Sequence, residues 1–170
     1  GAAMTRAISG RLHATPHSAG LKWPNDVLVD GSKICGILAE VVQGHPDAVV
    51  IGTGVNTRMA RVDLPVATAT SFEALGIEVD DDRLLADYLA ALDEQLTALS
   101  TAGGDAAASG VVGEIEALCS TLGRSVEVSL PDGTRLSGRA QRIDEDGRLV
   151  VVDALGVETA VAAGDVVHVR

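Results

Sequence analysis

The sequence predicts an α/β (α+β) fold in two parts: a sheet with packing helices over residues 1–122, then a small β-barrel over residues 123–170. Three observations predict it. Short β-branched runs separated by tight turns fill much of the first third of the chain. A segment whose apolar residues recur with helical spacing follows. Near the C-terminus the spacing of apolar residues changes to the pattern of short strands. A chain of 170 residues has room for one ordinary domain, or for a domain and a small module.

A predicted hairpin dominates the first part. Residues 27–29 and 33–42 are predicted strands, and Asp30-Gly31 between them has the composition of a two-residue hairpin turn. Pro24-Asn25-Asp26 is a predicted turn, because Pro fixes its own φ and Asn and Asp bond their own backbone. The hairpin therefore carries Lys33 back toward that turn.

One more strand and three helices complete the first part. Small and apolar residues at 5–12 predict a helix, and the β-branched run 49–55 predicts a buried strand whose glycines would let a ligand approach the backbone. Acidic residues at 80–82 favour the start of a helix that runs to about residue 100. Its 3.6-period face is predicted to lie in the core and consists of Leu84, Leu85, Tyr88, Leu89, Leu92, Leu96 and Leu99. Another short helix is predicted near 112–122.

Beyond Gly123 the pattern changes to short strands. Turns that contain Gly, Asp or both separate five strand-like runs, at 125–130, 135–143, 148–153, 157–162 and 165–170. Five short strands with tight turns are typical of a small barrel. The boundary between the two parts is predicted near residues 121–124.

Composition narrows the class of protein. Hydrophobic residues make up 46% of the chain but aromatic residues only 2%, so the core must be aliphatic. The net charge of −11 argues against general affinity for nucleic acid, whose phosphates require clustered Lys and Arg. The two cysteines, Cys35 and Cys119, have neither metal-ligand nor disulfide-scaffold spacing, which favours a reducing cytoplasm. No signal peptide and no apolar run of spanning length is visible, so no membrane insertion is expected.

The residues best suited to chemistry lie between positions 22 and 40. Lys22-Trp23-Pro24-Asn25-Asp26 is followed, seven residues after its Asp, by Lys33, with Gly36 shortly beyond. Two cations, an acid, an amide and a glycine so close together suit an anionic ligand that bears phosphate or carboxylate, with a metal nearby. The ordinary alternatives remain open: a strand lysine is usually only solvated, and Asn-Asp after a proline is usually only a turn.

These motifs resemble those of the biotin protein ligases, which attach biotin to a lysine of carboxylase carrier proteins. The matching blocks are KWPND at 22–26, G-x-K-x-x-G-I-L-x-E at 31–40 and Ile51-Gly52-Thr53-Gly54-Val55-Asn56, and the likeness continues through 69–72 into the C-terminal tail. Three ordered blocks at suitable spacing are far more specific than one. The resemblance implies a mixed sheet with packing helices, related to class II aminoacyl-tRNA synthetase and lipoate ligase cores, followed by an SH3-like barrel.

The resemblance also implies roles for particular residues. Lys33 is the leading catalytic candidate, expected to contact the biotin carboxylate and a phosphate oxygen of the adenylate. Asp26 is the expected contact for Mg²⁺ or nucleotide, because Mg²⁺ prefers carboxylate oxygens. For Trp23, burial competes with base stacking, and for Asn56 a turn-forming role competes with a nucleotide contact. The expected substrate-binding set is Lys22, Trp23, Asn25, Asp26, Lys33, Gly36, Ile37, Gly54 and Asn56.

The implied reaction has two steps. The carboxylate of biotin attacks the α-phosphorus of Mg-ATP to give biotinyl-5′-AMP and pyrophosphate, and the lysine amine of a biotin carboxyl carrier protein or carrier domain then displaces AMP. The expected cofactors are therefore ATP and Mg²⁺, with biotin as substrate. A homodimer is left open, and neither nucleic acid nor membrane is an expected partner.

The resemblance leaves two alternatives. The family's biotin-gripping strand, Ser/Thr-Asn element and Gly/Arg-rich loop have no counterpart in residues 1–170, so the chain is expected to be the C-terminal part of a ligase, separated from its first half or lacking it. A non-catalytic remnant that acts as a binding module is therefore one alternative. The other is a lipoyl or octanoyl transferase, in which thiol-dependent transfer would leave an acyl group on a cysteine.

Overall fold

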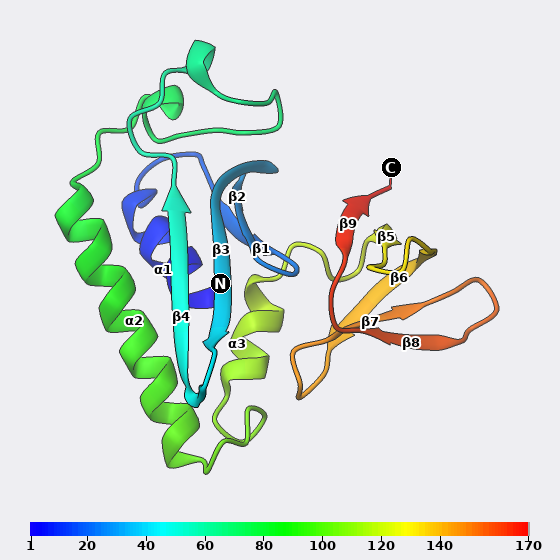
Figure 1. Cartoon of the computed structure of the whole chain (residues 1–170). Helices are drawn as coiled ribbons and strands as arrows, with labels where there is room; N and C mark the ends of the chain where they lie inside the picture. Colours follow the sequence, from blue (N-terminus) through cyan, green and yellow to red (C-terminus); the bar gives the residue numbers. More distant parts are fainter. Residues whose placement is uncertain (170) are drawn as a thin grey trace.

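The computed structural model describes residues 1–169, which form helices and two antiparallel sheets (Figure 1). The helices are α1 (Ala2–Arg11), α2 (Asp81–Thr101) and α3 (Val111–Leu118), with short 3-10 turns at Arg61–Asp63 and Glu73–Leu75. The first sheet contains β1 (Ala19–Lys22), β2 (Asp26–Val29), β3 (Ser32–Val42) and β4 (His45–Val55). The second contains β5 (Ser125–Ser129), β6 (Arg135–Ile143), β7 (Leu149–Val152), β8 (Glu158–Val161) and β9 (Asp165–His168). Arg170, the end of the last predicted strand, lies outside the described residues.

The first sheet has the strand order β1-β2-β3-β4, and every ladder in it is antiparallel. The predicted turn joins β2 to β3, with Asp30 at φ +49° and Gly31 at φ +82°, as a tight hairpin turn requires. Parallel pairing, which a mixed sheet was expected to contain, is confined to isolated bridges between Leu21 and Cys119 and between Lys33 and Ala69. Strand β1 has no counterpart in the sequence prediction.

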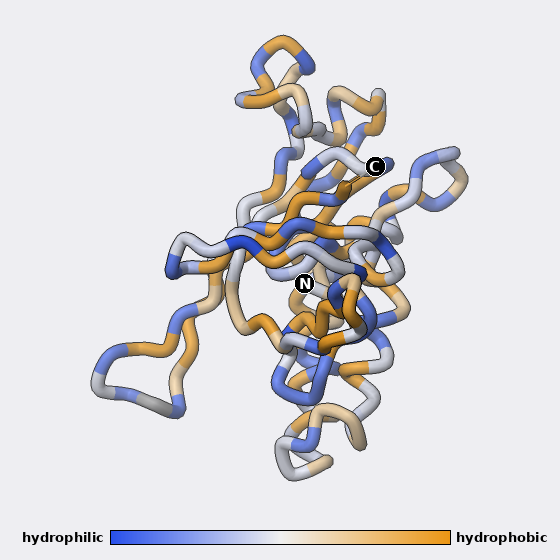
Figure 2. Tube along the Cα trace, turned by 90° about the vertical axis from the view of Figure 1, so that its right-hand side faces the viewer, coloured by the Kyte–Doolittle hydropathy of each residue, from blue (hydrophilic) through white to orange (hydrophobic). Residues whose placement is uncertain are grey.

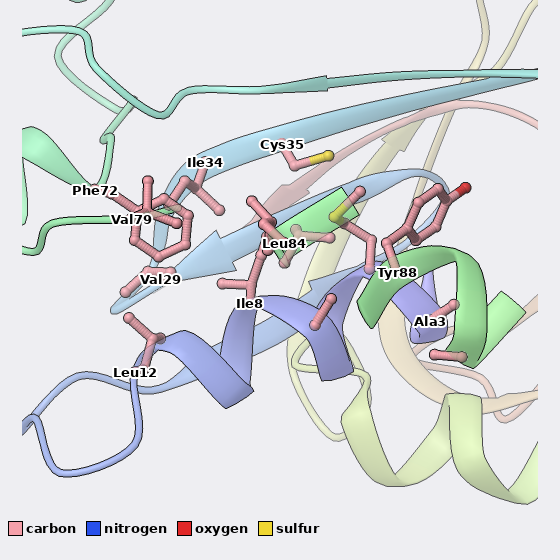
Figure 3. Packing of buried hydrophobic residues seen from close by; sticks show 14 residues of the cluster. Ala3, Ile8, Leu12, Val29, Ile34, Cys35, Phe72, Val79, Leu84 and Tyr88 are labelled. Carbon is pink, nitrogen blue, oxygen red and sulfur yellow. The ribbon is translucent and has the colours of Figure 1, made fainter. Parts of the chain in front are cut away.

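One face of the first sheet is covered by α1 and α2. Ile8 on α1, Leu84 on α2 and Ile34 on β3 meet in the core between these elements (Figure 3). The cluster is largely aliphatic, as the composition requires, with Phe72 as its largest fully buried side chain. Full burial of a side chain of this size contributes about 1.5–3 kcal/mol.

Helix α2 starts as predicted, but the expected core face is too wide. Asp80 caps the helix by accepting a hydrogen bond from the Arg83 backbone N–H at 3.0 Å. Leu84 and Tyr88 are buried. Leu85, Leu89 and Leu96, which were also predicted to lie in the core, are 52%, 52% and 53% exposed. The reason is that α2 packs mainly on α1, with a smaller contact to α3, and one neighbouring helix covers only a narrow stripe.

Helix α3 ends four residues before its predicted end. Cys119 adopts an extended conformation (φ −78°, ψ 102°), and its chain segment pairs with Leu21 of β1 instead of continuing the helix. Helix α3 contacts both β1 and β6, and so lies between the first sheet and the C-terminal strands (Figure 1). No helix within residues 1–169 is both long and apolar enough to cross a bilayer.

Residues 121–169 form a separate aliphatic core and are called the C-terminal module below. The strand order is β8-β7-β6-β5-β9. Strand β5 alternates polar and apolar residues, whereas β7 is apolar throughout. Figure 2 shows hydrophilic and hydrophobic stretches interspersed along the whole trace. Strands β8 and β9 lie at opposite edges and do not pair with each other in the described residues, so the sheet does not close into the expected barrel. The connection between Val161 and Asp165 can span at most about 14 Å, so the sheet must curl to bring its two edges near each other.

Candidate functional site

An ion pair between Lys33 and Asp26 marks the candidate site. Asp26 opens β2, and its Oδ1 lies 2.5 Å from Nζ of Lys33 on β3. The Asp26 side chain is only 18% exposed, whereas that of Lys33 is 48% exposed. The ammonium is therefore held by a half-buried carboxylate while remaining accessible to an anion from solvent.

A β-bulge places Lys33 on this side of the sheet. The β2–β3 register shifts between Val27, which pairs with Cys35, and Leu28, which pairs with Lys33, so that Ile34 is the extra residue. Strict alternation would put residues 33 and 35 on one face. Instead, Cys35 is buried in the core and Lys33 is exposed on the other face.

The segment 68–70 holds the backbone of Lys33. Its N–H donates to the Thr68 carbonyl at 2.8 Å, and its carbonyl accepts from the Thr70 N–H at 2.8 Å. The sequence reasoning did not assign this role to the segment. The run of small hydroxyl-bearing residues, Thr68, Thr70 and Ser71, was the available signal, because such side chains often hydrogen-bond to nearby backbone. The structure shows that Thr70 and Ser71 are buried.

Beside the ion pair, two glycines of neighbouring strands lie on the same face of the sheet. Across the four strands, Lys22 pairs with Asp26, Asp26 with Gly36, and Gly36 with Gly54, and directly paired residues share one face of the sheet. A methyl group on Gly36 would lie 3.2 Å from Lys33 Nζ, and one on Gly54 would have no neighbour within 4 Å. The face next to the ammonium is therefore open.

The open face becomes apolar farther along β3 and β4. Leu38 lies two residues beyond Gly36, on the same face, and is 60% exposed. It pairs with Gly52, where a methyl group would meet only a carbonyl oxygen at 3.9 Å. A cation at one end and an apolar strip at the other suit a ligand with an anionic end and an apolar body.

Asn25 and Ile37 are hydrogen-bonded to each other rather than directed toward the open face. The Asn25 side-chain amide donates to the Ile37 carbonyl at 2.7 Å, and the Asn25 carbonyl accepts from the Ile37 N–H at 2.9 Å. The Ile37 side chain packs against the core on the opposite face of the sheet. The structure therefore does not bring Ile37 to the open face, and Asn25 fixes the turn before Asp26.

Asn56 is also engaged by the protein itself. Its side-chain amide donates to the Thr70 carbonyl at 2.9 Å, its N–H donates to the Ile34 carbonyl at 2.9 Å, and its own carbonyl accepts from Phe72 at 3.2 Å. These bonds tie residues 70–72 to β3 and to the end of β4. Asn56 thus stabilises the segment that holds Lys33.

Trp23 and Lys22 extend from the site toward the C-terminal module. Trp23 is 4% exposed and lies in the module core, where its indole N–H donates to the Gly147 carbonyl at 3.0 Å. Of the alternatives for this residue, the structure shows burial. Lys22 stands opposite Asp26, and its charge also reaches the module. Burial, and then the positive charges of Arg124 and Lys22, lower the pKa of His168.

The two cysteines lie in apolar surroundings. Burial raises the pKa of the Cys35 thiol to about 11, so at neutral pH almost no thiolate is present. Cys119 is buried as well. Within residues 1–169, no three His, Cys, Asp or Glu side chains are grouped closely enough to hold a metal ion on their own. Asp26 is therefore a single carboxylate contact at most.

Two family models match the chain. The biotin/lipoate A/B protein ligase family matches residues 1–56, and the biotin protein ligase C-terminal domain matches residues 121–169. The chain is 37% identical over 171 residues to the biotin--[acetyl-CoA-carboxylase] ligase of Mycobacterium tuberculosis, a match that covers 100% of this chain and 60% of that protein. It is 28% identical to the bifunctional ligase/repressor BirA of Bacillus subtilis, a match that covers 95% of this chain and 50% of that protein.

The fold matches solved biotin protein ligases. The apo structure of the Aquifex aeolicus biotin protein ligase superposes with a TM-score of 0.81 at 21% identity, covering 99% of this chain and 72% of that one. The structure of the same ligase in complex with biotin and ATP gives a TM-score of 0.74 at 22% identity, and the match covers 99% of this chain and 70% of that one. At this identity the structural likeness supports the shared fold, including the placement of the C-terminal module beside the first sheet.

Proposed function

The chain belongs to the biotin protein ligase family, and we propose that it takes part in the ATP-dependent attachment of biotin to a lysine of a carboxylase carrier protein. The observation that carries the proposal is the accessible Lys33 ammonium beside a glycine-lined, partly apolar face. The chain spans 60% of the length of its Mycobacterium tuberculosis relative. We also propose the division into residues 1–122 and 123–170, since β5 begins at Ser125 and the second family model starts at residue 121.

In the first step Lys33 brings two anions together. The carboxylate oxygen of biotin attacks the α-phosphorus of ATP, the bond to the β-phosphate oxygen breaks, and pyrophosphate leaves. An ammonium between the carboxylate and the α-phosphate lowers their repulsion and stabilises the charge that develops on the phosphoryl oxygens. Asp26 keeps the ammonium in place. Gly36 and Gly54 let the apolar body of biotin lie against the strands.

One carboxylate is enough for the expected magnesium contact. Mg²⁺ is usually held by one or two carboxylates together with the substrate phosphates, so Asp26 could contact an ion that arrives with the triphosphate. In the second step the free amine of the carrier lysine attacks the acyl carbon, the acyl–phosphate bond breaks, and AMP leaves with the bonding electrons. Adenylation supplies the leaving group that a carboxylate lacks.

Replacing Lys33 with Ala tests the proposal. In the natural protein that contains residues 1–170, the rate of biotin-dependent pyrophosphate release should fall on the order of 100-fold, because a main source of charge stabilisation is lost. The thermal midpoint should change little, because the side chain is half exposed. The control is Arg135→Ala, which removes a surface cation that is 3.2 Å from Glu127 in the module. A Lys33→Ala rate within a few-fold of the Arg135→Ala rate would show that Lys33 does not act in the reaction and would overturn the proposed site.

Burial of both thiols disfavours the lipoyl or octanoyl transferase alternative. An acyl-cysteine intermediate needs a thiolate that a substrate can reach. Cys35 is 1% exposed with a pKa of about 11, and Cys119 is buried near α3. Mass spectrometry of the protein after incubation with an activated acyl donor should therefore show no thioester on either cysteine.

A further inference from the structure

The segment 22–26 is tied to the C-terminal module at its first residues. The Trp23 backbone N–H donates to the hydroxyl of Thr121 at 3.1 Å, and its indole N–H donates to the Gly147 carbonyl at 3.0 Å. Just before the segment, the Leu21 carbonyl accepts from the N–H and the hydroxyl of Ser120, at 2.8 and 3.0 Å. Both indole and Thr121 are buried, so these bonds are shielded from water.

The same segment is tied to the candidate site at its last residues. Asn25 makes its two hydrogen bonds to the backbone of Ile37, and Asp26 pairs with Lys33. Only Pro24 and one peptide bond on each side separate the indole of Trp23 from the amide of Asn25. A displacement of Trp23 is therefore passed almost directly to Asp26.

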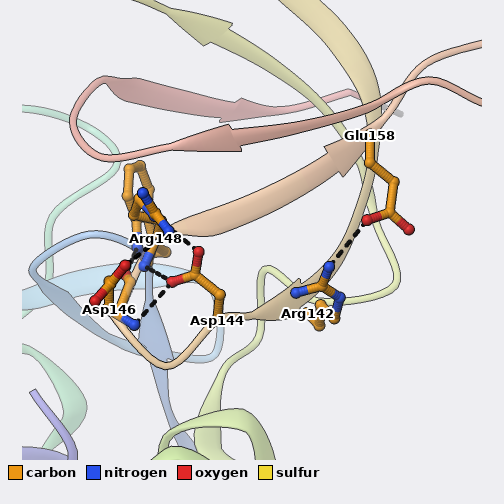
Figure 4. Close-up of polar contacts among 7 residues, drawn as sticks. Arg142, Asp144, Asp146, Arg148 and Glu158 are labelled. Carbon is orange, nitrogen blue, oxygen red and sulfur yellow. Dashed lines mark hydrogen bonds and ion pairs between the residues drawn. The ribbon is translucent and has the colours of Figure 1, made fainter.

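A rigid turn of the module presents the acceptor for Trp23. The carboxylate of Asp144 accepts from the backbone N–H groups of Asp146 and Arg148, at 3.1 and 2.8 Å, and pairs with the Arg148 guanidinium at 2.8 Å (Figure 4). Gly147 lies inside this turn at φ +79°. The direction of its carbonyl is therefore set by the Asp144 network.

Beside these hydrogen bonds, the module and the first sheet do not pack directly on each other everywhere. A cavity of about 460 Å³ separates the two, lined by Ser18, Leu28, Asp30, Ser120, Arg124 and His168 among others. Packing cannot fix the relative position of the module where the cavity lies. The position is fixed instead by the burial of Trp23 in the module core, by the hydrogen bonds of Leu21 and Trp23, and by the contacts of α3.

We propose that Trp23 is a positioning residue, through which the C-terminal module sets the place of Asp26 and hence the direction of the Lys33 ammonium. The inference rests on the proposed function, since it treats the Lys33 face as the site where the ligands react. Coupling of this kind is reciprocal, so a ligand that engages Lys33 also tightens the contact between Trp23 and the module.

A double-mutant cycle between Trp23→Phe and Asp26→Asn tests the inference. Trp23→Phe keeps most of the ring but removes the N–H, and should slow pyrophosphate release by about threefold to tenfold. If Trp23 acts through Asp26, the factor by which Asp26→Asn slows pyrophosphate release should be at least threefold smaller in the Trp23→Phe background than in the parent. Two effects that simply multiply would show that Trp23 has only a structural role, and would overturn the inference.

Asp144→Ala keeps the tryptophan but loosens the turn that receives it. Trp23 is the only tryptophan within residues 1–170, so its emission, taken as the difference between the parent and Trp23→Phe, reports on the surroundings of this indole. Addition of Mg-ATP with biotin should change the emission of the parent and of the control Arg142→Ala, which removes an exposed 2.9 Å pair with Glu158 that takes no part in the hydrogen bonds of the turn. The change should be at least halved in Asp144→Ala and in Lys33→Ala.

The outcomes separate this inference from the proposed function. If Asp26→Asn and Lys33→Ala leave pyrophosphate release unchanged, the proposed site is wrong and the inference falls with it. If these two variants lose activity, but Asp144→Ala keeps the full fluorescence response to Mg-ATP and biotin, the site stands and the coupling through Trp23 is refuted.

Discussion

Glycine meets opposite demands in the two sheets. In the C-terminal module, a methyl group on Gly138 would lie 2.3 Å from the Val152 carbonyl oxygen, and one on Gly164 would lie 2.8 Å from that of Ser129. In the first sheet, a methyl group on Gly36 would meet only the side-chain ends of Lys33 and Asp26, and one on Gly54 would have no neighbour within 4 Å. Folding explains the glycines of the module, whereas the open face of the first sheet has glycines that folding does not require.

Gly138→Ala should have the largest effect on stability. The new methyl group would overlap backbone atoms of β7 that cannot move without breaking the β6–β7 ladder. We expect a loss of about 3 kcal/mol in the free energy of unfolding, and a fall in the thermal midpoint on the order of 10 °C. Thermal denaturation followed by circular dichroism measures both. A variant as stable as the parent would remove the distinction between the two kinds of glycine.

Gly54→Ala should separate ligand binding from stability. Its methyl group projects into open space on the proposed ligand face, so the thermal midpoint should stay within about 2 °C of the parent. Biotin affinity should fall about tenfold, the cost of one misplaced methyl group in a binding site. Calorimetric titration of biotin measures it.

The matched control for Gly54→Ala is Gly113→Ala. Gly113 lies in α3, whose main contacts are with α1, α2, β1 and β6, and a methyl group added there would have no neighbour within 4 Å. Alanine there should leave biotin affinity unchanged and slightly raise stability, because Ala favours helix. Equal affinities for the two variants would argue that biotin does not lie against β4.

The smallest expected effect is a pH dependence of stability that arises in the C-terminal module. Burial, with Arg124 and Lys22, holds the pKa of His168 below its usual value of 6.5. As the pH falls through 6.5 the unfolded chain takes up a proton that the folded module resists, so this contribution to stability is present above 6.5 and is lost below it. His168→Gln should flatten the dependence of the thermal midpoint on pH between 7.5 and 5.5. A parent midpoint that rises over this fall in pH would contradict the assignment.

Local patterns in the sequence predicted local structure well. The Asp30-Gly31 turn and the Asp80 cap depend on residues within four positions of each other, and both are confirmed. The prediction that Leu85 and Leu89 lie in the core is wrong. Burial depends on how many neighbours a helix has, and the periodicity of apolar residues does not report that number. Strand β1 was missed for a similar reason, since its edge is completed by a segment about 100 residues away.

The candidate site shows the same division between local and long-range information. The sequence brought Asp26 and Lys33 together, because one tight hairpin joins them. It could not show that Trp23 turns toward the module, because the acceptor of its N–H lies 124 positions away. Asn56 and Ile37 were assigned to the ligand on the strength of the family motif, and the structure gives them hydrogen-bonding and packing roles within the protein.

The extra residue Ile34 shifts the alternation of side chains along strand β3 by one position. Up to the bulge, odd positions face the ligand side, and beyond it even positions do, as Lys33 and Gly36 show. Residues three positions apart in a regular strand face opposite sides, so Lys33 and Gly36 share a face only because one residue between them is left unpaired. Deleting that residue would leave the lysine and the glycine two positions apart, and a strand without the bulge would then keep both on the ligand side. In this stretch the number of residues and the presence of the bulge are therefore constrained together, independently of which side chains fill the strand.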